Sequence, residues 1–146
     1  MAQYILDSLY ENGENTEKDL ERAINWYNRS AENGNELAQY NLGRCYQLGI
    51  GIEKDENKAF EYYEKSAKKG HYMAQNIVGS LFHNGKIIEK SLETAMYWFR
   101  KAAKNENKFA QYNLGRIYQN GIGVEKDEIK AFKYYKKSAE KGILTW

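Results

Sequence analysis

This 146-residue chain has one cysteine, Cys45, and two histidines, His71 and His83, which are the residue types of thiol catalysis and of many zinc sites. A reactive thiol needs a nearby base or positive charge, and a structural zinc site needs about four Cys, His or carboxylate ligands. The two histidines have no acid-rich or cysteine-rich companion, so the sequence predicts no metal site. Cys45 falls on an apolar helical stripe where no motif places a base, and we interpret it as a small buried hydrophobic residue. No other nucleophile–base or carboxylate pair stands out, so we predict no catalytic residue, no cofactor and no enzymatic activity.

Two glycine-rich segments, GIGIEKD from Gly49 and GIGVEKD from Gly121, have the composition of a phosphate-binding loop. A phosphate loop follows a β-strand and carries a Lys-Ser/Thr pair at a fixed spacing, and neither feature is present. We therefore predict that both segments are turns between helices.

The charged and aromatic residues narrow the choice of partner. The run KYYKK from Lys133 mixes lysine and tyrosine as nucleic-acid binders do, but at helical spacing its tyrosines face inward and its lysines outward. A net charge of +2 adds no argument, so we predict no nucleic-acid partner. No apolar run approaches the roughly 18 residues of a membrane span, and no signal peptide is recognised. With one cysteine, the chain suits a reducing compartment, and we expect a cytoplasmic location and no membrane partner.

The segments that hold these residues recur along the chain. AQYNLGRCYQLGIG begins at Ala38 and AQYNLGRIYQNGIG at Ala110, with twelve of fourteen positions identical. Weaker copies begin at Ala2 and Ala74, so a unit starts every 36 residues. A period of this length is typical of stacked repeat proteins. We divide the chain into a single domain of four repeats, namely 2–37, 38–73, 74–109 and 110–145.

Each repeat is predicted to be a helix, a loop and a second helix. In the second repeat Ala38, Leu42, Cys45 and Tyr46 form one apolar stripe at i, i+4, i+7 and i+8. Gly43 lies beside this stripe, where the missing side chain would let another helix come close. Neither helix can bury its stripe alone, so successive hairpins must stack around a continuous core, which predicts an all-α fold.

The ends of the predicted helices follow from capping signals. Gly49 and its equivalents are expected to end the first helices, and Asp19, Asp55, Ser91 and Asp127 are expected to N-cap the second helices. The predicted helices span residues 2–12, 20–33, 38–48, 56–69, 74–84, 92–105, 110–120 and 128–141.

The repeat pattern A-x-Y-x-L-G-x-x-Y-x-x-G-x-G-[VI]-x-K-D-x-x-K-A-x-x-Y-Y-x-K-[SA]-A-x-x-G resembles the Sel1-like repeat, a relative of the tetratricopeptide repeat. The second repeat matches it at Ala38, Tyr40, Leu42, Gly43, Tyr46, Gly49, Gly51, Lys54, Asp55, Lys58, Ala59, Tyr62, Tyr63, Ala67 and Gly70, and the fourth matches from Ala110 to Gly142. The resemblance implies a right-handed α-solenoid of helical hairpins. It also implies a non-catalytic adaptor or scaffold that holds other proteins.

The third repeat departs from this pattern. It has Asn76 in place of tyrosine, Ile87 in place of the second loop glycine, and Glu106 in place of the closing glycine. We expect the 85–91 loop and the 105–109 turn to differ in shape from their equivalents. Such changes mark either a binding position or a relaxed constraint on surface loops.

One face of the first helices is a candidate binding surface. Positions three, seven and ten of each repeat fall at i, i+4 and i+7, away from the apolar stripe. In repeats two to four these residues are Tyr40, Arg44, Gln47, Asn76, Ser80, His83, Tyr112, Arg116 and Gln119. By similarity to tetratricopeptide arrays they line the concave groove, and tyrosine and arginine are common anchors of protein interfaces. We hypothesise that the groove takes an extended or helical peptide with at least one acidic group. Alternatively, the tyrosines pack between repeats, and Arg44 and Arg116 pair with nearby acids.

The ends of the chain and its relatives suggest further expectations. The chain starts inside a predicted helix and closes on Ile143, Leu144 and Trp146, so we expect a fragment of a longer array that self-associates through its C-terminal end. One alternative function is a regulatory segment of a larger multidomain protein such as a kinase. Another is β-lactam hydrolysis, described for cysteine-rich bacterial members of the family, whose paired cysteines this chain lacks.

Overall fold

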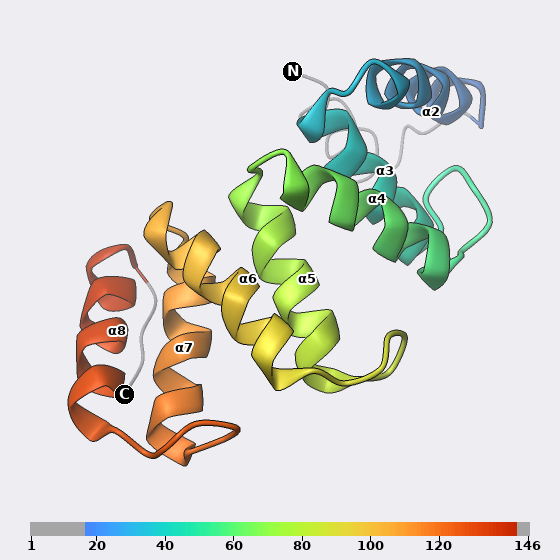
Figure 1. Ribbon diagram of the computed structural model, residues 1–146. Coiled ribbons are helices and arrows are strands. Elements are labelled where there is room, and N and C mark those ends of the chain that lie inside the picture. The colour runs from blue at the N-terminus through green and yellow to red at the C-terminus, as the bar shows by residue number, and fades with distance from the viewer. Residues whose placement is uncertain (1–16, 143–146) are drawn as a thin grey trace. The chain divides into compact units, whose positions relative to one another are not determined.

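The computed structural model describes residues 17–142 of the chain, with side chains from residue 19 onward, and Figure 1 shows this part as helices joined by short loops. Its seven helices are α2 (Glu17–Glu32), α3 (Glu36–Leu48), α4 (Glu56–Lys68), α5 (Tyr72–Asn84), α6 (Leu92–Lys104), α7 (Lys108–Asn120) and α8 (Glu128–Glu140). No strand occurs in the described part, which confirms the all-α prediction. None of the helices described there is long and apolar enough to cross a membrane. The predicted helix 2–12 and the apolar end at Ile143, Leu144 and Trp146 lie outside the described residues.

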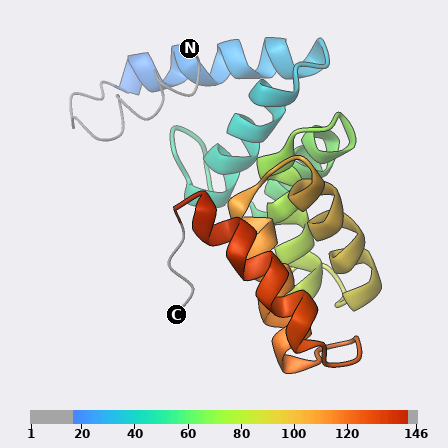
Figure 2. The same cartoon turned by 90° about the vertical axis from the view of Figure 1, so that its left-hand side faces the viewer.

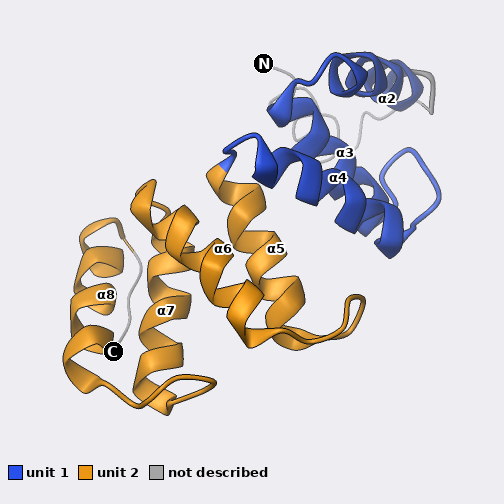
Figure 3. Cartoon of the chain, in the orientation of Figure 1, with its two compact units in different colours: residues 1–71 blue, residues 72–146 orange. Residues whose placement is uncertain are grey.

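The chain forms two compact units, residues 1–71 and 72–146 (Figure 3). The first unit contains α2, α3 and α4, and the second contains α5 to α8. In each hairpin, α3/α4, α5/α6 and α7/α8, the second helix packs against the first. Figure 1 shows α7 and α8 side by side, and in the turned view of Figure 2 α8 lies in front of α7. The first helix of a repeat also packs on the second helix of the repeat before it, as α3 does on α2 and α7 on α6.

The second helices begin where their caps predict. The side chains of Asp55, Ser91 and Asp127 accept hydrogen bonds from backbone N–H groups three residues later, which satisfies donors at the start of α4, α6 and α8. The prediction that Asp19 is an N-cap is wrong, because Asp19 lies within α2 rather than before its first residue.

The first helices begin two residues earlier than the predicted positions 38, 74 and 110. Asn35 and Asn107 cap α3 and α7, each accepting a bond of 2.8 Å from the backbone N–H of Ala38 or Ala110. The apolar stripe begins only after this cap, so the periodicity marked the first buried residue rather than the first helical one.

A glycine against an aromatic ring sets the distance between the two helices of each described hairpin. A Cβ atom on Gly43 or Gly115 would lie 2.7 Å from the ring of Tyr63 or Tyr135. On Gly79 it would lie 2.8 Å from the ring of Phe99. Such separations are shorter than any ordinary carbon–carbon contact, so the ring rests directly on the helix backbone. This confirms the close helix approach expected at Gly43.

In two of the hairpins, hydroxyl groups of the second helix form the same hydrogen bonds to the first helix. Tyr63 donates to the Gln47 amide oxygen at 2.6 Å, and Tyr135 donates to that of Gln119 at 2.6 Å. Likewise, Ser66 and Ser138 donate to the carbonyl oxygens of Glu36 and Lys108 at 2.7 and 2.9 Å. The hairpin α5/α6 has Phe99 and Ala102 at these positions, which have no hydroxyl and cannot make either bond.

Each unit has its own apolar core, and each core joins neighbouring repeats. In the first unit the buried cluster is Ile24, Tyr27, Ala31, Ala38, Leu42, Cys45 and Ile50. In the second it is Ala95, Met96, Phe99, Ala102, Ala110, Leu114, Ile117, Tyr118, Ala131 and Tyr135. A buried glutamine adds a polar tie between repeats: Gln39 donates to the Ala31 carbonyl, and Gln111 to that of Ala103. The stacking predicted from the paired stripes is therefore present inside each unit.

The turns agree with the predictions in part. Gly49 and Gly121 end α3 and α7 in the left-handed conformation, with φ of 70° and 65°, as predicted. The 85–91 loop differs from its equivalents as expected, because Ile87 does not take the positive φ of 70° found at Gly51 and Gly123.

The predicted change of shape in the 105–109 turn is wrong. Glu106 adopts a φ of 68°, in the same left-handed region as Gly34, Gly70 and Gly142. Its backbone N–H donates to the Ala103 carbonyl at 3.0 Å, as Gly34 and Gly70 do to their equivalents. The packing of the flanking helices requires this turn, so the backbone keeps the left-handed conformation even though Glu106 replaces glycine.

Replacement of Gly115 by alanine is expected to destabilise the second unit. The new methyl group would overlap the Tyr135 ring, which is only 7% exposed, and α8 would have to shift. Overpacking of this kind costs about 1–3 kcal/mol, which exceeds the gain in helix propensity of about 1 kcal/mol. Urea unfolding followed by circular dichroism measures the change, with Lys133→Ala on the exposed side of α8 as the control. A Gly115→Ala chain as stable as the wild type would show that this contact does not limit the packing.

Removal of the Tyr135 hydroxyl tests the tie between α8 and α7. Tyr135→Phe leaves the Gln119 amide oxygen without its donor and is expected to lower the free energy of unfolding by about 0.5–1.5 kcal/mol. The matched control is Tyr134→Phe, since the Tyr134 ring stacks on Tyr118 and this substitution keeps the ring. Equal unfolding midpoints for the two variants would mean that the Tyr135–Gln119 bond contributes no net stability.

Candidate functional site

The only cysteine of the chain lies in the core. Cys45 is fully buried in the first unit, as predicted, and burial raises the pKa of its thiol to about 12. The thiol is therefore protonated at neutral pH and is not a nucleophile. Within residues 17–142, no group of three or more His, Cys, Asp or Glu residues could hold a metal ion.

In the first unit, the predicted binding residues are largely engaged inside the fold. Tyr40 is only 5% exposed, lies 5.9 Å from the Tyr63 ring, and stacks on the His71 imidazole with ring centroids 4.7 Å apart. Burial lowers the pKa of His71. Gln47 accepts the Tyr63 hydroxyl, and Arg44 is half-buried. Tyr40 therefore packs inside the fold, but its ring partners Tyr63 and His71 belong to its own repeat rather than to a neighbouring one.

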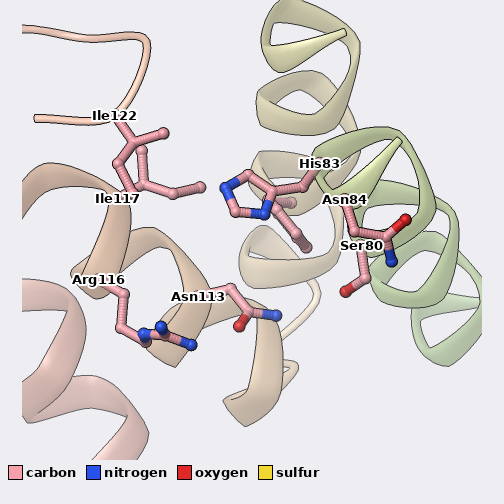
Figure 4. Close-up of a pocket in the computed structure, with 8 residues that line it drawn as sticks. Ser80, His83, Asn84, Asn113, Arg116, Ile117 and Ile122 are labelled. Carbon is pink, nitrogen blue, oxygen red and sulfur yellow. The ribbon is translucent and has the colours of Figure 1, made fainter. Parts of the chain in front are cut away.

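The second unit brings several predicted residues together around a pocket of about 210 Å³. The pocket is lined by Ser80, His83, Asn84, Phe99, Asn113, Arg116, Ile117 and Ile122 (Figure 4). Of the nine residues predicted from the sequence, three line it: Ser80 and His83 on α5, and Arg116 on α7. These three residues are therefore neighbours in space, with Ser80 and Arg116 at position seven of their repeats and His83 at position ten.

The other predicted residues of the second unit lie beside this pocket rather than in it. Asn76 accepts a hydrogen bond of 3.0 Å from the Asn113 amide, which links α5 to α7. The ring of Tyr112 lies 5.7 Å from that of Tyr135, and the Arg116 guanidinium lies over Tyr112 at 6.0 Å. Gln119 is exposed, with its amide oxygen bonded to Tyr135.

Some lining residues were not predicted. Asn113 directly follows the predicted Tyr112, and its equivalent in the second repeat, Asn41, is fully buried. The sequence did contain one signal for Asn113. Position three of the repeat is tyrosine in the other repeats but Asn76 in the third, and a small amide there leaves room for a partner amide. Ile117 and Ile122 belong to the apolar pattern, and nothing in the sequence marked them as pocket residues.

His83 is the unusual residue of this pocket. It occupies the position of Gln47 and Gln119, four residues after the glycine on which the aromatic ring rests. In the other two hairpins, this position accepts a tyrosine hydroxyl, but here the ring is Phe99, which lies edge-on to the imidazole at 6.4 Å. In the described part of the chain, the buried Nε2 atom of His83 has no hydrogen-bond partner.

The electrostatic surroundings of the pocket are positive. Burial lowers the pKa of His83, and the nearby cations Lys90 and Arg116 lower it further. No acidic residue is among those that line the pocket, and the Arg116 guanidinium makes no ion pair with any described residue. The pocket therefore combines a cation, a neutral imidazole, a hydroxyl and amides over an apolar wall.

Comparison with known proteins agrees with this repeat architecture. The model of the Sel1 repeat matches the chain four times, over residues 1–35, 37–71, 73–107 and 108–143. No curated protein matches the chain.

Solved structures of repeat proteins are similar to the chain. The structure of c5321, a protective antigen present in uropathogenic Escherichia coli strains and displaying an SLR fold, is 34% identical, with a TM-score of 0.84 over 98% of this chain and 31% of that one. A Sel1 repeat protein from Oxalobacter formigenes is 38% identical, with a TM-score of 0.78 over 84% of this chain and 51% of that one. Helicobacter pylori cysteine rich protein B is 25% identical, with a TM-score of 0.67 over 90% and 94% of the two chains.

The chain thus spans 31% and 51% of the length of the first two similar structures. Each described repeat from the second onward forms one helical hairpin, as the matches to the Sel1 repeat divide the chain. Because the four matches to the Sel1 repeat cover nearly all of the sequence, the chain belongs to the Sel1-repeat family.

Proposed function

We propose that this chain is a non-catalytic interaction module that binds a protein or peptide through the exposed face of its first helices. The observation that carries the proposal is the pocket of the second unit, where Ser80, His83 and Arg116 meet on that face. Arg116 is exposed, has no acidic partner among the described residues, and is of the type that anchors interfaces. Membership of the Sel1-repeat family supports the same role, since these repeats are typically protein-interaction scaffolds.

The burial of the predicted residues suggests how they share this role. Arg116 and Gln119 are exposed and would form the most accessible contacts. Arg44, Gln47, Asn76, Ser80, His83 and Tyr112 are partly exposed and would line the sides of the contact surface. Tyr40 is buried, so we assign it to supporting the Tyr63 ring rather than to direct contact.

The chemistry of the core supports a binding role over a catalytic one. The only thiol, Cys45, is buried with a raised pKa and supplies no nucleophile at neutral pH. The perturbed pKa values of Tyr63 and Tyr135 have burial as their first cause, and both rings belong to the packing of a hairpin. Ser80 and His83 line the same pocket, but the buried Nε2 atom of His83 accepts no hydrogen bond from the serine hydroxyl, so the two are not arranged as a nucleophile and its base.

Charge reversal on the first-helix face tests this proposal. Arg116→Glu is expected to lower recovery of a specific protein from a lysate of the source cells by about tenfold or more, as a loss of 1.4 kcal/mol would do. The matched control is Lys133→Glu, which makes the same charge change at an exposed residue of the second helix α8. Quantitative mass spectrometry of the captured proteins measures recovery, and circular dichroism confirms that both variants fold.

Arg44→Glu extends the test to the first unit, where a further loss is expected if one partner contacts both repeats. Equal recovery by the wild type, Arg116→Glu and Lys133→Glu would rule out the first-helix face as the binding surface. Attention would then move to the second helices.

A further inference from the structure

We propose that the pocket of the second unit receives a glutamate side chain of the bound partner, with its carboxylate held between Arg116 and His83. This inference rests on the proposed interaction role and names the chemical group that the site recognises. It concerns the pocket shown in Figure 4, which lies entirely within the second unit.

The first argument comes from comparing the hairpins of the same chain. Gln47 and Gln119 have their amide oxygens satisfied inside the fold by Tyr63 and Tyr135. In the hairpin α5/α6 both members of this pair are different: the ring is Phe99, and the helix position is His83. Loss of the hydroxyl removes the internal partner, and Figure 4 shows the imidazole extending from α5 toward Ile117 and Ile122.

An unpartnered buried polar atom needs an explanation, because leaving it unsatisfied costs roughly 1–3 kcal/mol. A carboxylate oxygen placed near His83 would accept a hydrogen bond from Nε2–H, which the imidazole carries as the Nε2–H tautomer or as the imidazolium. The same group would meet the Arg116 guanidinium, which no described carboxylate occupies. Hydrogen bonds between charged groups are shorter and stronger than neutral ones, so these two residues are suited to hold an anion.

The walls of the pocket indicate what carries the carboxylate. Phe99, Ile117 and Ile122 supply apolar surface to the lining, and the remaining lining residues supply polar groups. A glutamate side chain matches both, since its two methylene groups can contact the apolar wall while its carboxylate meets the cation. Because no acidic residue lines the pocket, the charge of this ligand would be opposite to that of its surroundings.

The remaining polar groups of the pocket are consistent with one bound side chain. The Asn113 amide is held by its bond to Asn76, and the oxygen of Asn84 accepts the backbone N–H of Lys86. The Asn84 nitrogen and the Ser80 hydroxyl are therefore available as further donors. A volume of about 210 Å³ leaves space for a side chain rather than for a helix or a strand.

The occupant would also change the protonation of His83. In the free protein, burial and the cations Lys90 and Arg116 keep its pKa below the usual value, so the imidazole is neutral at pH 7. A bound carboxylate adds a negative charge beside the ring and raises this pKa. Binding therefore takes up a proton between the two pKa values, and affinity rises as the pH falls through that interval. Below a pH of about 4.3 the glutamate itself becomes protonated, and affinity falls again.

The test uses the full chain and a blocked peptide, acetyl-Ala-Ala-Glu-Ala-Ala-amide, as the probe. His71 and His83 are the only histidines, so imidazole NMR signals report on two residues, and His83→Gln identifies which signal is which. We expect a saturable shift of the His83 signals and a rise in its pKa, with His71 in the first unit unchanged. The glutamine form of the peptide should produce neither effect.

Two variants separate recognition of the carboxylate from general effects on folding. Arg116→Gln should weaken the peptide by about tenfold or more, as the loss of one charged hydrogen bond at 1.5–3 kcal/mol predicts. His83→Gln places the glutamine of the other repeats in this position, and it should remove the dependence of affinity on pH between 5 and 8. Lys133→Gln on α8 is the control with the same loss of charge and should bind as the wild type does.

Three outcomes would overturn the assignment. Equal shifts with the glutamate and glutamine peptides would show that the pocket does not recognise a carboxylate. Binding of the glutamine peptide with a free C-terminus, but not of the blocked glutamate peptide, would assign the site to a chain end instead. The third outcome is that Arg116→Glu lowers recovery of a captured protein while the glutamate peptide causes no shift of the His83 signals. That result would support the interaction role and contradict the glutamate assignment of the pocket.

Discussion

The contact between a first-helix glycine and a second-helix aromatic ring is the constraint on which the described hairpins depend. At Gly43, Gly79 and Gly115 a side chain of even one carbon would lie 2.7 to 2.8 Å from the opposing ring. The ring therefore rests on the helix backbone, and its far end reaches the residue one turn later on the same helix face. In two hairpins this residue is a glutamine that accepts the tyrosine hydroxyl, so one packing contact also determines where a polar side chain must lie.

The third repeat keeps the packing and loses the polar ties. Phe99 fills the place of Tyr63 and Tyr135, but it has no hydroxyl to offer to His83. Ala102 likewise replaces the serine that binds the start of the first helix in the other hairpins. The backbone is retained because apolar contacts alone hold the ring, which is only 2% exposed. A helix position that accepts a tyrosine hydroxyl in two hairpins thus holds a histidine whose buried Nε2 atom has no hydrogen-bond partner in the third.

Backbone geometry overrides side-chain preference in the same repeat. Glu106 occupies the left-handed conformation that glycine takes at the equivalent turns, although a residue with a Cβ atom is disfavoured there. Its carboxylate pairs with Lys141, and this ion pair lowers the pKa of the exposed carboxyl group. The turn between α6 and α7 is held by the stacking of both helices, so the sequence can change without changing the path of the chain. The loop after α5 is less constrained, and there the replacement of glycine by Ile87 does alter the backbone.

The sequence by itself determined the repeat period, the helical class, the caps at Asp55, Ser91 and Asp127, and the close approach at Gly43, because each depends on neighbours within one repeat. It also selected the first-helix positions to which Ser80, His83 and Arg116 belong. Only the tertiary structure decided that these three residues share a pocket with Asn113 and Ile122, that Tyr40 is buried, and that α3 starts at Glu36. Those facts depend on which side chains of different helices meet, and helical periodicity defines the face of a helix without defining what packs against it.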